Sequence, residues 1–162
     1  PFMVMGLIPL FSWAIFPALE RRGIWRTPLS RMTGGMFIAV LSFGAAALVQ
    51  VAIDGGRTPH VLWQIPQYLL LTVAEVLVSV TGLEFSYTQA PRSMRSTIMS
   101  LWFLAIALGN LLTALVSTLP SLSGAAYFWL FTGLMLGAAL AFRAVARRYR
   151  VAPAAGAPEA AV

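Results

Sequence analysis

Long apolar runs recur along almost all of this 162-residue chain, and they constrain its fold more than any other feature. Each run has about 20 residues, the length that an α-helix needs to cross a hydrocarbon core about 30 Å thick. The runs do not alternate apolar and polar residues, as the strands of a membrane β-barrel would. Because lipid offers no partners for backbone polar groups, helix is the state that remains. The sequence therefore predicts an all-α integral membrane protein.

Composition excludes a water-soluble globule. Hydrophobic residues make up 59% of the chain and charged residues 10%, against about 45 to 50% and 25% in soluble domains. We expect a transmembrane bundle over residues 1–150 and a disordered cytoplasmic tail over residues 151–162, where large apolar side chains are missing. Five spans are predicted within the bundle: 2–19, 32–53, 61–87, 96–119 and 125–146.

The basic residues predict how the chain is oriented. All 11 are arginine, and the net charge is +6. Ten of them fall in alternate connections, and only Arg57 falls on the other side. The positive-inside rule then places the amino terminus outside and the carboxyl terminus in the cytoplasm, in the inner (plasma) membrane. Because these arginines lie in short links between apolar runs, we expect them to meet anionic lipid and expect no nucleic-acid partner.

Small residues and prolines predict where helices pack closely and where they bend. Glycine and alanine allow close approach of helices in lipid, and an interior proline removes a backbone donor. The small residues concerned are Gly34, Gly35, Gly44 and Ala45 to Ala47 in the second span and Gly133, Gly137 and Ala141 in the fifth. Kinks are predicted at Pro9, Pro17 and Pro66.

Glu75 is the most informative residue. It lies 14 positions after Val61, about 21 Å along a helix and therefore well inside the bilayer. An ionised side chain there costs about 2.5 to 3.5 kcal/mol on insertion scales, which makes it a candidate functional residue. The alternative is a buried structural carboxylate, protonated or paired, in a packed bundle.

Polar and small residues share one face of the helix that carries Glu75. They recur at alternating steps of four and three, as one stripe of a helix requires. We expect the stripe to face a protein interior or a water-filled path. Its members are Gln64, Tyr68, Thr72, Glu75, Ser79, Gly82 and Ser86.

The fourth span offers a second face of this kind. Trp102, Gly109 and Thr113 fall in a narrow arc, with Asn110 and Ser117 less than a quarter turn away. Trp102 could form the wall of a pocket. It could equally be an interfacial anchor, because it lies close to the cytoplasmic end of its helix.

A charged cluster lies near the cytoplasmic boundary. Glu84 is within reach of Arg92 or Arg95, and an ion pair between them could latch the inner ends of two helices as a gate. The alternative is a surface salt bridge worth less than about 1 kcal/mol.

No motif indicates an enzyme, so we predict no catalytic residue. The chain has no cysteine, and the single His60 lacks the neighbours of a zinc site. We accordingly expect neither a metal nor a cofactor.

Several segments together resemble the proton-coupled oligopeptide transporter family of the major facilitator superfamily. The similarity covers all of the chain except the tail and corresponds to helices eight to twelve of a twelve-helix core. The residues that carry it are Trp63 to Tyr68, Ala74 to Leu77, Thr81 to Tyr87, Gln89 to Pro91, Ser93, Met94 and Leu101 to Leu104.

The resemblance implies roles for individual residues. Glu75 would receive the ammonium group of a small peptide, Ser79 lies one turn further along the same face, and Trp102 would line a side-chain pocket. Together with Tyr68 and Asn110, these residues form the predicted substrate-binding set.

The resemblance also implies the reaction, namely import of di- and tripeptides driven by a proton gradient. We expect the chain to be a fragment, since it starts at Pro1 and the family's proton-coupling and carboxylate-binding residues would lie upstream. Its expected partners are the small peptide, the lipid bilayer and the missing amino-terminal helices. Two alternatives remain open: a same-fold transporter of nitrate, an amino acid or a peptide-like drug, and a membrane scaffold or assembly subunit.

Overall fold

The computed structural model describes residues 5, 9, 27–119 and 124–149, with the backbone alone at residue 92. Within these residues, four helical segments are long and apolar enough to cross a membrane, which confirms the all-α membrane fold. Of the predicted span 2–19, only Met5 and Pro9 are described, and both are helical. The rest of that span, with Pro17, and the tail 151–162 lie outside the described residues. The elements are α3 (Pro28–Asp54), η2 (Val61–Trp63), α4 (Gln64–Glu75), η3 (Val76–Val80), α5 (Thr81–Gln89), η4 (Arg92–Met94), α6 (Arg95–Ser117) and α7 (Ala125–Arg148).

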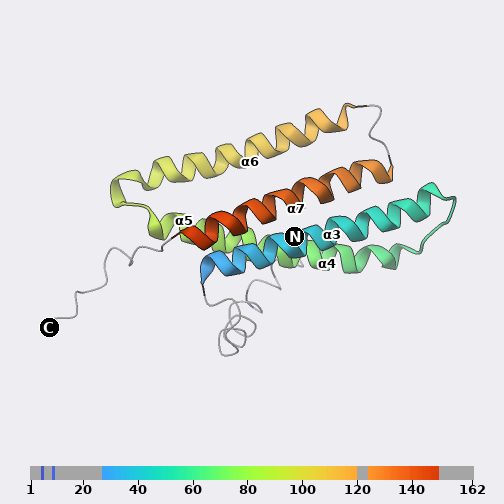
Figure 1. Ribbon diagram of the computed structural model, residues 1–162, viewed down its shortest axis with the longest axis horizontal. Helices are drawn as coiled ribbons and strands as arrows, with labels where there is room; N and C mark the ends of the chain where they lie inside the picture. Colours follow the sequence, from blue (N-terminus) through green and yellow to red (C-terminus); the bar gives the residue numbers. More distant parts are fainter. Residues whose placement is uncertain (1–4, 6–8, 10–26, 120–123, 150–162) are drawn as a thin grey trace.

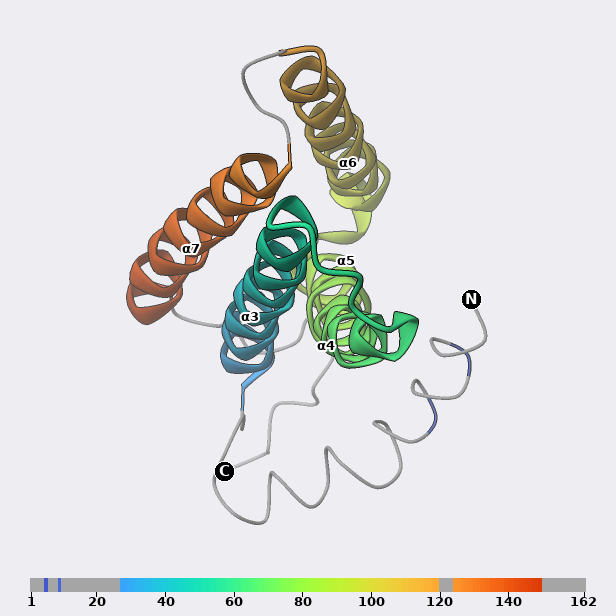
Figure 2. The same cartoon turned by 90° about the vertical axis from the view of Figure 1, so that its right-hand side faces the viewer.

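Helix α3 lies at the centre of the bundle. Helix α7 packs along one side of it, and the α4–η3–α5 segment packs along the other (Figures 1 and 2). The buried Ser42 hydroxyl donates a hydrogen bond of 2.9 Å to the carbonyl of Gln67 on α4. On the other side, the rings of Phe43 and Phe131 stack with centroids 6.4 Å apart. A polar tie and an aromatic contact thus hold α3 between its two neighbours.

Helix α3 starts at Pro28, earlier than the predicted Met32, because the residues before Met32 form a capping box. The Thr27 hydroxyl accepts from the Ser30 amide at 3.2 Å, and the Thr27 amide donates to the Ser30 hydroxyl at 3.3 Å. Pro28 occupies the first helical position, where its missing N–H is not needed. Hydropathy alone does not detect this polar first turn.

The helical segment from Val61 to Gln89 departs from regular α-helix after Glu75, away from its proline. The predicted kink at Pro66 is wrong, because Pro66 lies in the first turn of α4, where helix N–H groups have no intrahelical acceptor. The helix instead widens into the π-helical turn η3, directly after Glu75.

Close helix packing occurs at one predicted glycine and not at three others among the described residues. A Cβ on Gly35 would lie 2.7 Å from Cβ of Leu77, so α3 approaches η3 closely there. A Cβ on Gly44, Gly133 or Gly137 would meet no described atom within 4 Å, so the close packing predicted at Gly44 is not found there. The prediction of close packing at Gly133 and Gly137 is therefore wrong for the described residues, since α7 buries Ala139 instead.

At one end of the bundle, α3 caps α7. Asp54, the last residue of α3, accepts a hydrogen bond from the Ala125 amide through Oδ2 at 2.8 Å. Its Oδ1 accepts from Nε2 of Gln50 at 2.9 Å. Gly124, the N-cap residue of α7, has no side chain to cap with, so a residue 71 positions away supplies the acceptor.

Helix α6 lies apart from α3 and α7. Its main contacts are with α5 and η4 at its amino-terminal end (Figure 1), and none of its residues is buried within the described chain. Nearly the whole apolar surface of α6 is therefore open to lipid or to other helices.

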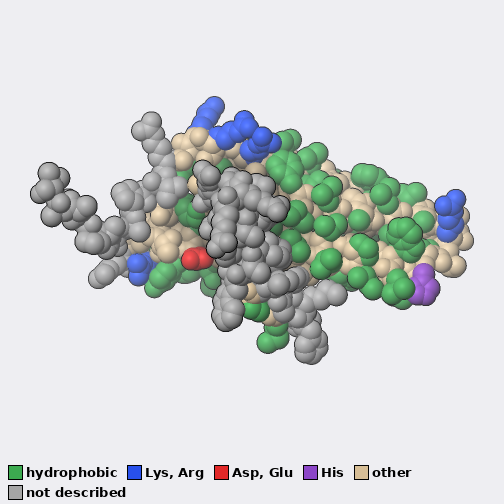
Figure 3. Space-filling view, turned by 90° about the horizontal axis from the view of Figure 1, so that it is seen from below, with side chains coloured by type: hydrophobic (Ala, Val, Ile, Leu, Met, Phe, Trp, Pro, Cys, Tyr) green, Lys and Arg blue, Asp and Glu red, His purple; other side chains and the backbone are tan. Residues whose placement is uncertain are grey.

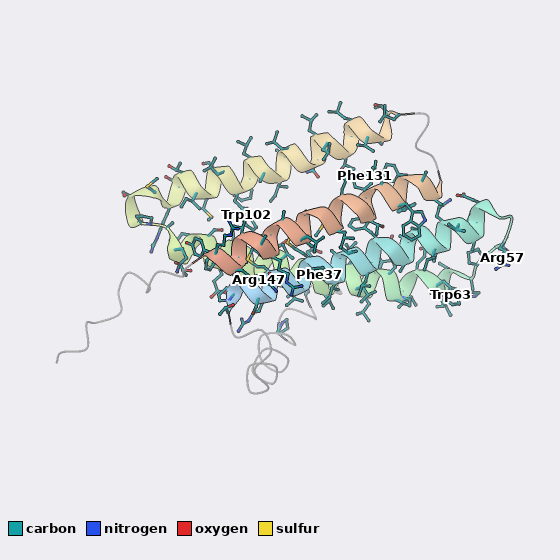
Figure 4. The ribbon with its side chains drawn as sticks, viewed as in Figure 1. Phe37, Arg57, Trp63, Trp102, Phe131 and Arg147 are labelled. Carbon is teal, nitrogen blue, oxygen red and sulfur yellow. The ribbon has the colours of Figure 1, made fainter. Side chains whose placement is uncertain are left out.

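The arginines separate between the two ends of the bundle. Arg57 lies at one end of the bundle and Arg147 toward the other (Figure 4), and Arg57 lines one pocket together with His60. Figure 3 shows other arginine side chains gathered away from the end that carries the histidine. Such a separation is expected when successive connections lie on opposite sides of the membrane and the connections on one side carry most of the arginines.

Candidate functional site

Glu75 is the last residue of α4, and its side chain is exposed in the described chain. Its neighbours Ala74, Val76 and Leu77 are buried, with relative exposures of 3%, 2% and 0%. These three residues belong to the face that packs on α3, because Gly35 of α3 meets both Leu77 and the carbonyl of Ala74. The carboxylate of Glu75 therefore lies on the open side of a firmly packed segment.

The π turn η3 changes which residues follow Glu75 on the open side. A π turn holds one residue more than an α turn, so it shifts the register of all later residues. Ser79 is exposed, as the four-and-three spacing predicts, but Gly82 is buried and Leu83 is exposed in its place. Thr72 is also buried, at 8% exposure, and its hydroxyl donates to the Tyr68 carbonyl at 2.8 Å.

The predicted stripe is therefore wrong in part. Its spacing assumed an unbroken α-helix of 3.6 residues per turn, whereas the π turn rotates the residues after Glu75, Gly82 among them. Thr72 precedes the π turn and is buried within α4 itself. The exposed face runs instead through Tyr68, Glu75, Ser79, Leu83 and Tyr87.

Trp102 of α6 lies against α5 (Figure 4). A Cβ on Gly82 would lie 2.6 Å from Cη2 of Trp102 and 3.0 Å from Cε of Met32. The absence of a side chain at Gly82 thus lets the indole of Trp102 pack directly against α5, next to Met32 of α3. Trp102 remains partly exposed, so its ring both packs on a helix and presents a surface beside it.

Tyr68 and Asn110 are both exposed, Tyr68 at 53%. Glu75 lies seven residues from Gly82, and Asn110 lies eight residues from Trp102, on helices that run in opposite directions. Both separations correspond to about 10 to 12 Å of helix rise. Measured from the Gly82–Trp102 contact, Glu75 and Asn110 therefore lie at similar depths on two helices.

The predicted inner cluster is arranged differently from a simple ion pair. The Arg95 guanidinium lies over the Tyr87 ring, 4.5 Å from its centroid, with Nη1 3.4 Å from the Tyr87 hydroxyl. Glu84 is exposed, and no ion pair joins it to Arg95 in the described part of the chain. The Arg92 side chain lies outside what the structure describes.

Sequence reasoning missed the features that position Glu75 and Trp102. These are the π turn, the contact of Trp102 with Gly82 and the contact of Gly35 with η3. A glycine within an apolar run was the one available signal, and it indicated close packing without naming the partner. Among the described residues, no group of three or more His, Asp or Glu side chains could hold a metal ion.

Comparison with known proteins identifies the family. A protein-family model described as "PTR2: POT family" matches residues 1–130, most of the chain. The chain belongs to the POT family. Two crystal structures support the same conclusion: an auto-inhibited POT family peptide transporter (TM-score 0.86, 40% identity) and the POT family transporter PepTSo (TM-score 0.81, 41% identity). They match 98% and 92% of this chain.

Relatives in this family are considerably longer than the present chain. Solute carrier family 15 member 2 of Rattus norvegicus is 47% identical over 89 residues, which is 55% of this chain and 12% of the rat protein. Peptide transporter PTR2 of Saccharomyces cerevisiae is 36% identical over 143 residues, which is 78% of this chain and 23% of the yeast protein. The chain likewise spans 33% and 32% of the two POT structures. It matches a minor part of each of these transporters.

Proposed function

We propose that this POT family chain forms most of the carboxyl-terminal bundle of a longer symporter that imports di- and tripeptides with protons. The observation that carries the proposal is Glu75, a carboxylate on the open face of a packed membrane helix. The names of the rat, yeast and crystallised relatives, which are solute carriers or peptide transporters, support transport as the general activity.

The role of Glu75 in this proposal is to bind the ammonium group of the peptide. At 4 Å, opposite unit charges attract by about 1 kcal/mol in water and by about 4 kcal/mol at an effective dielectric constant of 20. A carboxylate shielded from bulk water by the rest of a transporter would therefore hold an amine much more strongly than one at a protein surface. The same carboxylate would repel a bare anion, which favours peptides over nitrate.

The other predicted substrate-binding residues support this role by their placement. Ser79 follows Glu75 on the open face, and Tyr68 precedes it by about two turns. Asn110 lies at a similar depth on α6, and Trp102 presents its partly exposed indole beside Gly82. We assign Ser79, Tyr68 and Asn110 to polar contacts with the peptide and Trp102 to a side-chain pocket.

The inner end of α5 and the start of α6 form the proposed cytoplasmic gate. Glu84 is exposed and lies three residues before Tyr87, which contacts Arg95. A motion of α6 could exchange the Arg95–Tyr87 contact for an ion pair with Glu84. Transporters of this superfamily alternate access by rocking their halves about a central site. The proton gradient, and not a bound cofactor, would drive that cycle.

The test is uptake of labelled dialanine by liposomes that contain the complete protein, with and without an inward proton gradient. We expect gradient-driven uptake in the parent and its loss in Glu75→Gln, which keeps the size and removes the charge. Glu75→Asp is the matched control, because it keeps the charge and should retain part of the uptake. No uptake by a folded parent would refute peptide symport, whereas equal uptake by Glu75→Gln would refute the assigned role of Glu75.

A further inference from the structure

A groove of about 510 Å³ opens between the first turns of α3 and the last turns of α7, at the arginine-rich end of the bundle. Arg143 and Arg147 line it from α7, and Phe37 lines it from α3 (Figure 4). Hydroxyl-bearing residues line it as well, namely Thr27, Ser30, Thr33 and Tyr149. The groove is separate from the face that carries Glu75, and the proposed transport reaction makes no use of it.

The two arginines carry charge that the described chain does not neutralise. Arg143 and Arg147 lie four residues apart, on one face of α7, where like charges repel. Neither guanidinium has a hydrogen-bond or ion-pair partner among the described residues. Two adjacent cations beside a groove are an arrangement that an anion would stabilise.

Two of the four hydroxyl groups that line the groove already donate to the backbone of α3 or its N-cap. Ser30 donates its hydroxyl hydrogen to the Thr27 carbonyl at 2.8 Å, and Thr33 donates to the Leu29 carbonyl at 2.7 Å. The guanidinium groups of Arg143 and Arg147 supply the positively charged donors of the groove. Their planar forks match the oxygens of a phosphate group.

The groove continues below the level at which a phosphate would bind. Arg143 lies five residues before the end of α7, about 7 Å in, so its long side chain can reach back toward the membrane surface. Phe37 lies ten residues after Thr27, about 15 Å further into the bilayer. The lining thus changes from charged and polar at the rim to apolar in depth, as a headgroup with an acyl chain attached would require.

We propose that this groove binds an anionic phospholipid, with the phosphate held by Arg143 and Arg147 and an acyl chain lying toward Phe37. The chemical group that would bind is a phosphate, as a free ion or as the phosphodiester of a lipid headgroup. The apolar inner part of the groove favours the lipid over free phosphate. The lipid would join the ends of α3 and α7 at the membrane surface. This site does not depend on which substrate the transporter carries.

The experiment is native mass spectrometry of the complete, delipidated protein with added phosphatidylglycerol or phosphatidylcholine of identical acyl chains. We expect the parent to retain phosphatidylglycerol in preference to phosphatidylcholine. The double variant Arg143→Gln with Arg147→Gln should lose at least about ten-fold in phosphatidylglycerol binding, because each hydrogen bond to a charged group contributes roughly that factor. The single variants carry the test if the double variant does not fold, as judged by circular dichroism.

Arg148→Gln is the matched control, because Arg148 ends the same helix with the same charge but does not line the groove. We expect it to bind phosphatidylglycerol like the parent. Equal losses in Arg148→Gln and the double variant would indicate nonspecific charge attraction and overturn the proposal. Unchanged binding in the double variant, or equal retention of phosphatidylcholine, would overturn it as well.

An excess of inorganic phosphate separates the two sources of the ligand. We expect it to leave phosphatidylglycerol bound, since a free phosphate gains nothing from the apolar depth of the groove. Full displacement by inorganic phosphate would assign the groove to a soluble phosphate and overturn the lipid as its occupant.

Discussion

At Gly35 the contact between α3 and η3 leaves no room for a side chain. A Cβ there would lie 2.7 Å from Cβ of Leu77, 2.8 Å from Cγ2 of Val78 and 3.3 Å from the Ala74 carbonyl. Leu77 is completely buried, and η3 directly follows Glu75. A single hydrogen atom in place of a methyl group therefore determines how closely α3 approaches the segment that carries the proposed ammonium site.

Gly35→Ala should accordingly destabilise the protein. We expect a loss of about 1 to 3 kcal/mol, the usual range when a packed core must accept an extra methyl group. Gly44→Ala is the control on the same helix, because a Cβ at Gly44 meets no described atom within 4 Å. That variant should be neutral or gain up to about 1 kcal/mol from helix propensity. Thermal unfolding of the purified protein in detergent measures both, and equal midpoints would contradict the assigned contact.

At the residue scale, the sequence can single out a candidate where one residue carries its own signal. Placing a carboxylate within an apolar membrane span costs free energy whichever helices surround it. Glu75 could therefore be singled out without knowledge of the tertiary structure. The sequence left open whether Trp102 lines a pocket or anchors the helix, because that depends on its neighbour across space. The neighbour is Gly82, 20 positions earlier in the chain.

At the scale of elements, the α3–α7 pair is tied at its Arg57 end by a cap that comes from another helix. Asp54 accepts the Ala125 amide at the start of α7, where a negative charge is also favoured by the helix dipole. Gly124 has a φ of +60°, and a Cβ there would lie 2.5 Å from Oδ2 of Asp54. Glycine thus permits both the turn and the close approach of the carboxylate.

Asp54→Ala should destabilise the protein by about 0.5 to 2 kcal/mol, the usual value of a helix N-cap. Gly124→Ala should also destabilise it, through the positive φ and through contact with the carboxylate. In the double variant the second cause disappears, so the two losses should sum to more than the measured total. Unfolding midpoints of the three variants give the coupling, and strict additivity would show that Asp54 and Gly124 act independently.

The π turn leads to a different prediction about accessibility. In a cysteine-free background, cysteines at Ser79 and Leu83 should react with an aqueous thiol reagent in the complete protein. A cysteine at Thr81 should stay silent, because Thr81 is 6% exposed and lies on the packed side. Silence at Ser79 and Leu83 together would favour a packed interface over a water-filled path, and would support the scaffold alternative.

The sequence predicted the extent of the helix that carries Glu75 but not the π turn within it. The helix from Val61 could be predicted from its length and hydropathy, and its end differs by only two residues from the predicted Tyr87. The helical register after Glu75 could not be predicted from the sequence, since Val76, Val78 and Val80 are as compatible with an α-helix as with a π turn. One extra residue in a turn changes the facing of every later side chain.

Over the whole molecule, the separation of Arg57 from the other arginines gives a test of orientation. Thr58→Cys should react from outside intact cells with a membrane-impermeant thiol reagent, because the Arg57 end is predicted to face outward. Ser93→Cys, at the opposite end in η4, should react only after the membrane is permeabilised. The reverse pattern would invert the proposed topology and place the carboxyl terminus outside.

The sequence alone predicts the class of the protein and four of the spans that the structure describes, and it singles out Glu75 as a candidate functional residue. Those properties follow from transfer free energies, which depend on the length and composition of each segment and not on its neighbours. The three-dimensional packing was needed to show which glycines make close contacts, where the open face lies after Glu75, and that Asp54 caps a helix that begins 71 positions later. These depend on which surfaces meet, and in lipid the contacts that select them are short-range packing and hydrogen bonds rather than hydrophobic burial.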